Sequence, residues 1–127
     1  IKSGLKIIFC IGETRKERRV KKTNLILKKQ IEKGLKSIKN KSKIIIAYEP
    51  VWSIGTGVIP KEADLNKTIS FIKSRFVKKY PKILYGGSVN TNNVSILKKI
   101  ASIDGFLIGG ASQNPKKFID IIKKTIN

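Results

Sequence analysis

A single carboxylate at the end of an apolar run is the first residue of this sequence that could carry chemistry. Residues 44–48 form a run typical of a buried strand, and Glu49 follows it directly. Pro50 comes next, and proline cannot donate a hydrogen bond to continue a strand ladder. A loop containing Gly55 and Gly57 follows. Because ligands bind at the C-terminal ends of strands in parallel α/β proteins, Glu49 is a candidate acid or base.

Small residues follow the other apolar runs. They are Gly12-Glu13 after residues 6–11, Gly86-Gly87-Ser88 after residues 83–85, and Gly109-Gly110 after residues 106–108. Glycine lets backbone N–H groups approach a ligand closely, and a Gly-Gly pair before a helix suits a phosphate. A lone Gly-Gly pair is usually a turn, and a lone strand-end glutamate is usually an ion-pair partner. Together, however, a base and a phosphate cradle indicate proton transfer on a small phosphorylated substrate.

Helical patterns separate the apolar runs. Apolar residues recur at spacings of three and four over residues 20–38, 65–76, 94–101 and 118–125. We expect Pro60 at the first position of the second helix, Asn114-Pro115 at the start of the last, and a turn at residues 40–42. The order strand, loop, helix recurs four times. This order predicts an α/β fold of four βα units, with the strand ends sharing one face.

The composition is strongly basic. The 127 residues are 40% hydrophobic, enough for one small domain with a core, and 28 Lys+Arg against 8 Asp+Glu give a net charge of +20. Such a charge is typical of nucleic-acid binders. However, the lysines recur along the expected helices, as in Lys78-Lys79 and Lys123-Lys124, and the aromatic–basic interleaving of RNA-binding sheets is absent. We therefore interpret the charge as a solvated helical surface and do not expect a nucleic-acid partner.

Cysteine and histidine usage restricts the chemistry further. The chain has one cysteine, Cys10, and no histidine. A lone thiol cannot form an internal disulfide, so we expect a reducing cytoplasmic location. We expect no metal site and no cofactor, and we expect Cys10 to be buried and inert because no histidine can activate it. No apolar run approaches the roughly 20 residues that span a membrane, so no membrane association is expected.

Four segments, in order, resemble the triosephosphate isomerase family. They are residues 8–14 (IFCIGET), 47–57 (AYEPVWSIGTG), 83–90 (ILYGGSVN) and 104–112 (DGFLIGGAS). The second and third are highly specific to that family, and the order and spacing agree along essentially the whole chain. The resemblance implies the C-terminal half of a (β/α)8 (TIM) barrel. Residues 1–127 would form strands five to eight of a single domain whose N-terminal half is absent.

The resemblance implies a reaction and roles for individual residues. Glu49 would be the catalytic base that interconverts dihydroxyacetone phosphate and glyceraldehyde 3-phosphate, a step of glycolysis and gluconeogenesis, through an enediolate. Leu107 would form an apolar wall beside this base, and Cys10 and Glu13 would support the site. The substrate phosphate would be held by backbone amides of Gly55, Ser88, Gly109 and Gly110.

The resemblance also implies a lid over the base. Its first hinge would be Pro50-Val51-Trp52, and its tip would be Ser53-Ile54-Gly55-Thr56-Gly57, with Ile54 covering the carboxylate. Tyr85 and Ser88 would bond to the closed lid. The second hinge departs from the family pattern of one basic and two small residues, because Val58-Ile59-Pro60 stands there. We expect this hinge to be stiffer than the common one.

The resemblance covers only part of the family's active site. The substrate-orienting Asn and Lys belong to its first βα unit, and its electrophilic His to the fourth. We therefore expect residues 1–127 alone to lack enzymatic turnover, and the full-length protein to be a homodimer. A half barrel exposes two sheet edges and should pair with another copy or the other half. Alternatives are a basic half-barrel that binds nucleic acid, or another phosphate-binding barrel, such as an indole- or phosphoribosyl-processing enzyme.

Overall fold

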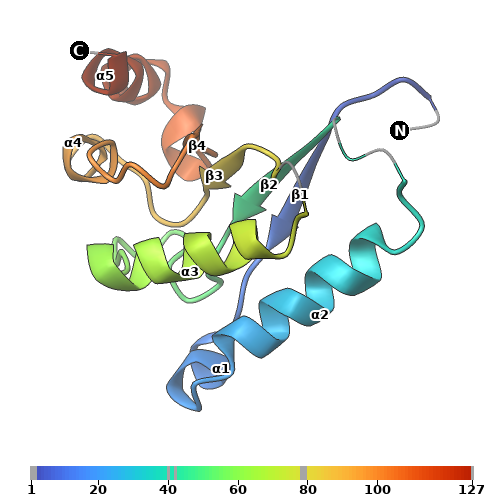
Figure 1. Cartoon of the computed structure of the whole chain (residues 1–127). Helices are drawn as coiled ribbons and strands as arrows, with labels where there is room; N and C mark the ends of the chain where they lie inside the picture. Colours follow the sequence, from blue (N-terminus) through green and yellow to red (C-terminus); the bar gives the residue numbers. More distant parts are fainter. Residues whose placement is uncertain (1–2, 40, 42, 78–79, 127) are drawn as a thin grey trace.

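A parallel sheet organises the computed structural model, which describes residues 3–39, 41, 43–77 and 80–126 (Figure 1). Its four strands, in spatial order, are β1 (Ile7–Ile11), β2 (Ile44–Tyr48), β3 (Ile83–Tyr85) and β4 (Gly105–Phe106). Cys10 pairs with Ala47, and Tyr48 pairs with Tyr85. The expected α/β class with four βα units is confirmed, and the sheet is consistent with half of a TIM barrel.

Helices follow the strands. They are α1 (Arg15–Arg19), α2 (Thr23–Leu35), α3 (Glu62–Ser74), α4 (Val94–Leu97) and α5 (Pro115–Ile126), with a 3-10 turn, η1 (Gly110–Gln113). In Figure 1, α2 and α3 lie side by side over one face of the sheet, and α4 and α5 lie near β4. Leu27 of α2 and Ile69 of α3 are fully buried in the core with Ile46 of β2. Burying each such side chain contributes about 1.5–3 kcal/mol.

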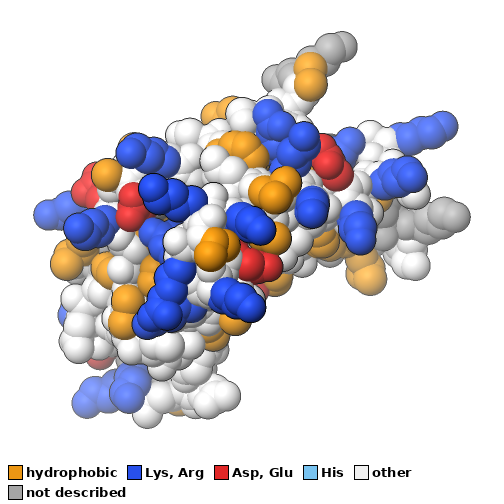
Figure 2. All heavy atoms as spheres, turned by 90° about the horizontal axis from the view of Figure 1, so that it is seen from below, with side chains coloured by type: hydrophobic (Ala, Val, Ile, Leu, Met, Phe, Trp, Pro, Cys, Tyr) orange, Lys and Arg blue, Asp and Glu red, His pale blue; other side chains and the backbone are white. Residues whose placement is uncertain are grey.

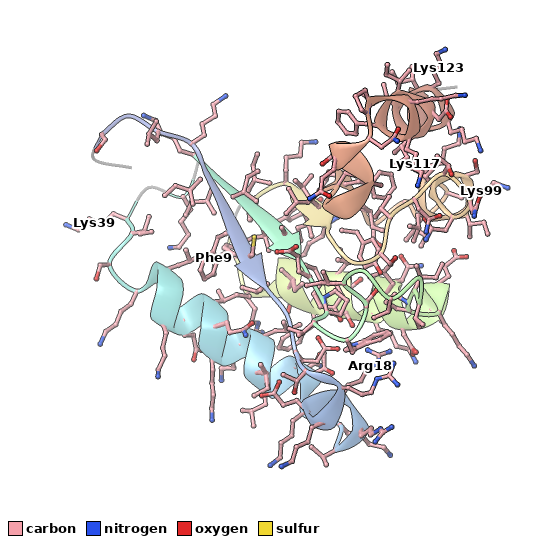
Figure 3. The ribbon with its side chains drawn as sticks, turned by 180° about the vertical axis from the view of Figure 1, so that it is seen from behind. Phe9, Arg18, Lys39, Lys99, Lys117 and Lys123 are labelled. Carbon is pink, nitrogen blue, oxygen red and sulfur yellow. The ribbon has the colours of Figure 1, made fainter. Side chains whose placement is uncertain are left out.

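Gly34 shows how closely α2 packs on the sheet. Phe9 of β1, labelled in Figure 3, contacts the helix at this residue. A Cβ on Gly34 would lie 2.2 Å from Phe9 Cζ. Glycine costs a helix interior about 1 kcal/mol relative to alanine, but here the close approach of the aromatic ring requires it.

The helix expected over residues 20–38 is wrong at its start. A separate helix, α1, comes first, and Lys21 (φ 56°) divides it from α2. Thr14 begins α1 with a capping box: Thr14 Oγ1 accepts from Glu17 N–H at 3.3 Å, and the Glu17 carboxylate accepts from Thr14 N–H at 2.8 Å. The Thr-x-x-Glu spacing could have indicated this start.

Other boundaries also differ from expectation; the helix expected over residues 94–101, for example, ends at Leu97. Pro60 is not the first residue of α3, because the chain stays extended through Lys61 and the helix begins at Glu62. The strand expected over residues 106–108 is β4, Gly105–Phe106. By contrast, the expected cap of α5 is confirmed, since Asn114 Oδ1 accepts from Lys117 N–H at 3.0 Å. The turn expected at residues 40–42 and the Lys78-Lys79 pair lie partly or wholly outside the described residues.

The sheet face opposite α2 is open at β1. Side chains alternate along a strand, so Ile8 and Cys10 point away from the helix that Phe9 contacts. Ile8 is 47% exposed, and Cys10 is also exposed. The prediction that Cys10 is buried is therefore wrong, because the helices that cover the sheet at β1 lie on its other face.

The positive charge is spread out on the face of the molecule that Figure 2 shows. On the face shown in Figure 2, Lys and Arg side chains are interspersed with acidic and apolar ones and do not fill one groove. Figure 3 labels Lys99, Lys117 and Lys123 at the neighbouring elements α4 and α5, and Lys39 far from them, after α2. Within the described ranges, no helix has the length and apolar content needed to cross a bilayer.

Candidate active site

Glu49 lies at the carboxyl edge of the sheet, where three strands end. Its N–H donates to Ile11 O at 2.8 Å, and Gly86 N–H donates to Tyr48 O at 2.8 Å. The Glu49 side chain rests on Gly86, where an added Cβ would lie 2.6 Å from Glu49 Cγ and 3.1 Å from Oε1. A Cβ on Gly12 would lie 1.8 Å from Glu49 O. Two strand-end glycines therefore provide the space that Glu49 occupies.

Cys10 is a neighbour of this carboxylate. Desolvation, and then a hydrogen bond to Glu49 and its negative charge, raise the pKa of the Cys10 thiol to about 11. The thiol therefore stays protonated near neutral pH. A protonated thiol is a weak nucleophile, so this geometry favours a supporting role for Cys10.

The segment that follows Glu49 lies against the loop after β3. Gly57 N–H donates to Ser88 Oγ at 3.0 Å, and Ser53 Oγ lies 3.0 Å from Tyr85 Oη. Gly55 (φ 70°) and Gly57 (φ 78°) have left-handed backbone conformations, which glycine adopts without steric cost. The structure thus brings the expected lid, residues 50–57, onto Tyr85 and Ser88.

Other expected site residues are exposed to solvent or only partly buried. Ile54 is 49% exposed, so the lid tip leaves half of the side chain expected to cover Glu49 open to solvent. Gly109 and Gly110 are exposed at the start of η1, and no hydrogen bond among the described residues joins them to the lid. Leu107 is half-buried, and its N–H donates to Tyr85 O at 3.0 Å. The structure therefore brings the expected lid and the loop after β3 together, and leaves the Gly109-Gly110 loop open.

Glu13 contacts the expected first hinge, residues 50–52. Its carboxylate is fully buried and accepts from Trp52 Nε1 at 3.0 Å and from Tyr48 Oη at 3.1 Å. Burial, followed by the charge of Glu13 and the hydrogen bond to it, raises the pKa of Tyr48. Tyr48 therefore remains a neutral donor to Glu13. These bonds join Trp52, in the expected hinge, to the carboxyl edge of the sheet.

Arg18 joins this network and was not expected from the sequence. Its guanidinium pairs with Glu13 at 3.4 Å and with Asp64 at 3.2 Å, and it lies 4.7 Å from the centre of the Trp52 ring. Such stacking of a cation on an aromatic face contributes about 0.5–2 kcal/mol. The capping box that starts α1 was the available signal, because a helix at that point places Arg18 near Glu13.

Comparison with known proteins decides the family. The family model described as triosephosphate isomerase matches residues 1–125. The chain belongs to the triosephosphate isomerase family. It is 46% identical to the triosephosphate isomerase of Thermodesulfovibrio yellowstonii over 129 residues and to that of Mycoplasma mobile over 123 residues. Each comparison covers 97% of this chain.

A fungal relative agrees with the two bacterial ones. The triosephosphate isomerase of Debaryomyces hansenii is 42% identical over 130 residues, which cover 97% of this chain. The chain covers 52%, 50% and 52% of these three relatives, so it spans about half the length of the triosephosphate isomerases that it matches. The four-stranded sheet agrees with that share, because a TIM barrel has eight βα units.

Replacing Glu13 with glutamine is expected to destabilise the protein. Glutamine keeps the shape but removes the charge that accepts from Trp52, Tyr48 and Arg18, so the free energy of unfolding should fall by about 2 kcal/mol. Urea unfolding of the complete polypeptide that contains this chain measures the effect. The matched control is Glu32→Gln, whose exposed pair with Lys28 at 3.8 Å should contribute less than about 0.5 kcal/mol. Equal losses in the two variants would contradict this role of Glu13.

Proposed function

We propose that this chain supplies the catalytic base, the lid and the phosphate-binding loops of a triose-phosphate isomerase. The reaction interconverts dihydroxyacetone phosphate and glyceraldehyde 3-phosphate. One observation carries the proposal: the Glu49 side chain rests on Gly86 beside a lid that Tyr85 and Ser88 contact. A carboxylate base at a strand end beside a small-residue loop suits a small phosphorylated substrate.

The proposed mechanism is a proton transfer between adjacent carbons. Glu49 removes a proton from the carbon next to the carbonyl, which gives an enediolate, and returns a proton to the neighbouring carbon. The electrophile of the other βα units moves the hydroxyl proton to the former carbonyl oxygen. The lid holds substrate and base close and keeps water away, so that the enediolate is protonated before it loses phosphate. Leu107 and Ile54 provide apolar surface beside the base. Both steps move only protons, so the mechanism needs no cofactor.

The phosphate is proposed to bind backbone N–H groups of Gly55, Ser88, Gly109 and Gly110. The two exposed glycines at the start of η1 leave their N–H groups accessible to a ligand. Ser88 N–H already donates to Ser53 Oγ at 3.2 Å. A phosphate oxygen would share that N–H in a three-centre bond, a common arrangement at helix and loop ends.

The complete polypeptide is proposed to add what these four βα units lack. The chain contains no histidine, so the electrophile must come from the other units. The resemblance places the substrate-orienting Asn and Lys in the first βα unit. We propose that the complete protein acts in glycolysis and gluconeogenesis in the cytoplasm, as a homodimer. The chain covers only about half of the length of its relatives, which supports a further segment of similar size in the complete polypeptide.

The chain by itself, residues 1–127, is expected not to isomerise triose phosphates at an enzymatic rate. Losing a single electrophilic donor typically costs about 10²–10³ in kcat, and here the substrate-orienting groups are absent as well. Conversion of dihydroxyacetone phosphate, followed by NMR, should be rapid with the complete polypeptide and near background with the purified fragment. A fragment with the turnover of the complete polypeptide would overturn this expectation.

No observation specifically supports either alternative, a half-barrel that binds nucleic acid or another phosphate-binding barrel. A nucleic-acid site is usually a continuous basic surface, whereas the basic side chains in Figure 2 are dispersed among acidic and apolar ones. Tight binding in gel shifts with a steep salt dependence would favour it. Another phosphate-binding barrel would account for the Gly-Gly pairs, but not for Glu49 with its particular lid.

A further inference from the structure

Ser53 is a fully buried hydroxyl within the lid, and its bonds join three segments. Ser53 Oγ donates to Val58 O at 2.5 Å, accepts from Ser88 N–H at 3.2 Å and lies 3.0 Å from Tyr85 Oη. A hydroxyl has one proton to donate and two lone pairs that accept. Because a carbonyl can only accept, the Ser53 proton goes to Val58 O, and Tyr85 must therefore donate to Ser53. The hydroxyl thus uses its one donor proton and both of its acceptor lone pairs.

The surrounding backbone leaves space for these bonds. A Cβ on Gly87 would lie 2.2 Å from Tyr85 Oη and 2.6 Å from Ser53 Oγ, so only glycine at this point lets the two hydroxyls meet. In the second hinge, Val58 N–H donates to Thr56 Oγ1 at 3.2 Å, and Pro60 has no N–H to donate. Ser53 contacts this hinge through its hydrogen bond to Val58 O.

We propose that Ser53 is a positioning residue that latches both ends of the lid to the phosphate-binding loop after β3. It does not touch the substrate; it acts by fixing Ser88 and Tyr85 against the lid. The inference rests on the proposed function of this site, since the latch matters for catalysis only if the lid covers a bound triose phosphate. The lid contacts themselves, however, can be measured without any turnover.

The test uses Trp52, the neighbour of Ser53 and the only tryptophan in this chain. The complete polypeptide is labelled with 5-fluorotryptophan, and the Trp52 signal is assigned with Trp52→Phe. In Ser53→Ala we expect the fluorine resonance of Trp52 to shift or broaden as the lid opens, and kcat/KM to fall about tenfold. The matched control is Ser74→Ala, which removes an exposed hydroxyl bonded to Phe71 O at 2.7 Å and should change neither quantity.

A second substitution separates the latch from a general loss of packing. Tyr85→Phe removes the donor to the same hydroxyl, so the double variant Ser53→Ala/Tyr85→Phe should lose little more than Ser53→Ala alone. Losses in kcat/KM that multiply, or an unchanged Trp52 resonance in Ser53→Ala, would overturn the latch. If the unmodified protein does not isomerise triose phosphates, the proposed function fails, and the fluorine signal still decides whether Ser53 holds the lid.

Discussion

Replacing Glu49 with glutamine in the complete polypeptide is expected to lower kcat by about 10³-fold or more. Glutamine has nearly the same shape and can still rest on Gly86, but its amide oxygen cannot take up the proton that the reaction must move. A positioned general base contributes about 10²–10⁴ to the rate, and Glu49 is the only carboxylate that follows directly on β2. Initial rates at saturating substrate, measured in both directions, give the effect.

The control for this substitution is Glu62→Gln. Glu62 is an exposed glutamate in the first turn of α3, so its replacement makes the same chemical change away from the lid. Its kcat should stay within about twofold of the unmodified protein, as for most surface substitutions. A Glu49→Gln protein that turns over as fast as Glu62→Gln would show that Glu49 is not the base.

Replacing Gly86 with alanine is expected to lower kcat by about 10²-fold with a smaller change in KM. The added methyl group would lie 2.6 Å from Glu49 Cγ, closer than carbon atoms can approach, so the base must move. A displacement of about 1 Å of a catalytic group can cost 10²-fold in rate. Steady-state kinetics of Gly86→Ala in the complete polypeptide separate this loss of kcat from weaker binding.

Gly34→Ala is the matched control for Gly86→Ala. It also forces a methyl group into an occupied position, 2.2 Å from Phe9 Cζ, but it lies where α2 packs on β1. Overpacking of this kind lowers stability by about 1–3 kcal/mol without moving the base. We therefore expect Gly34→Ala to unfold more easily and to keep its kcat. Equal losses of kcat in the two variants would attribute the effect of Gly86→Ala to general destabilisation.

The strands and their ends could be predicted from the sequence because apolar runs are short, bounded and followed by glycine. Residues 44–48 and 83–85 are strands over the ranges expected from the pattern alone. The start of α1 could not be read from periodicity, because Val20 continues the apolar spacing of α2 while its side chain is exposed. Local capping by Thr14 overrides that pattern.

The contacts between strand ends could not be predicted from the sequence. Arg18 meets Trp52 only because the segment after β2 lies against α1, and Ser53 meets Tyr85 only because Gly87 has no side chain. Cys10 was expected to be buried and inert because no histidine can activate it, yet its exposure depends on which face of the sheet the helices cover. Each of these outcomes depends on tertiary packing between segments distant in the chain.

Hydrogen exchange at the substrate carbon is the most direct test of Glu49 as a proton-transfer base. Dihydroxyacetone phosphate is incubated in D2O with the complete polypeptide, and deuterium at its hydroxymethyl carbon is followed by NMR. The unmodified protein and Glu62→Gln should introduce solvent deuterium there, because the abstracted proton exchanges before it returns. Glu49→Gln should introduce none above background. Deuterium incorporation by Glu49→Gln at the unmodified rate would contradict the assignment of Glu49 as the base.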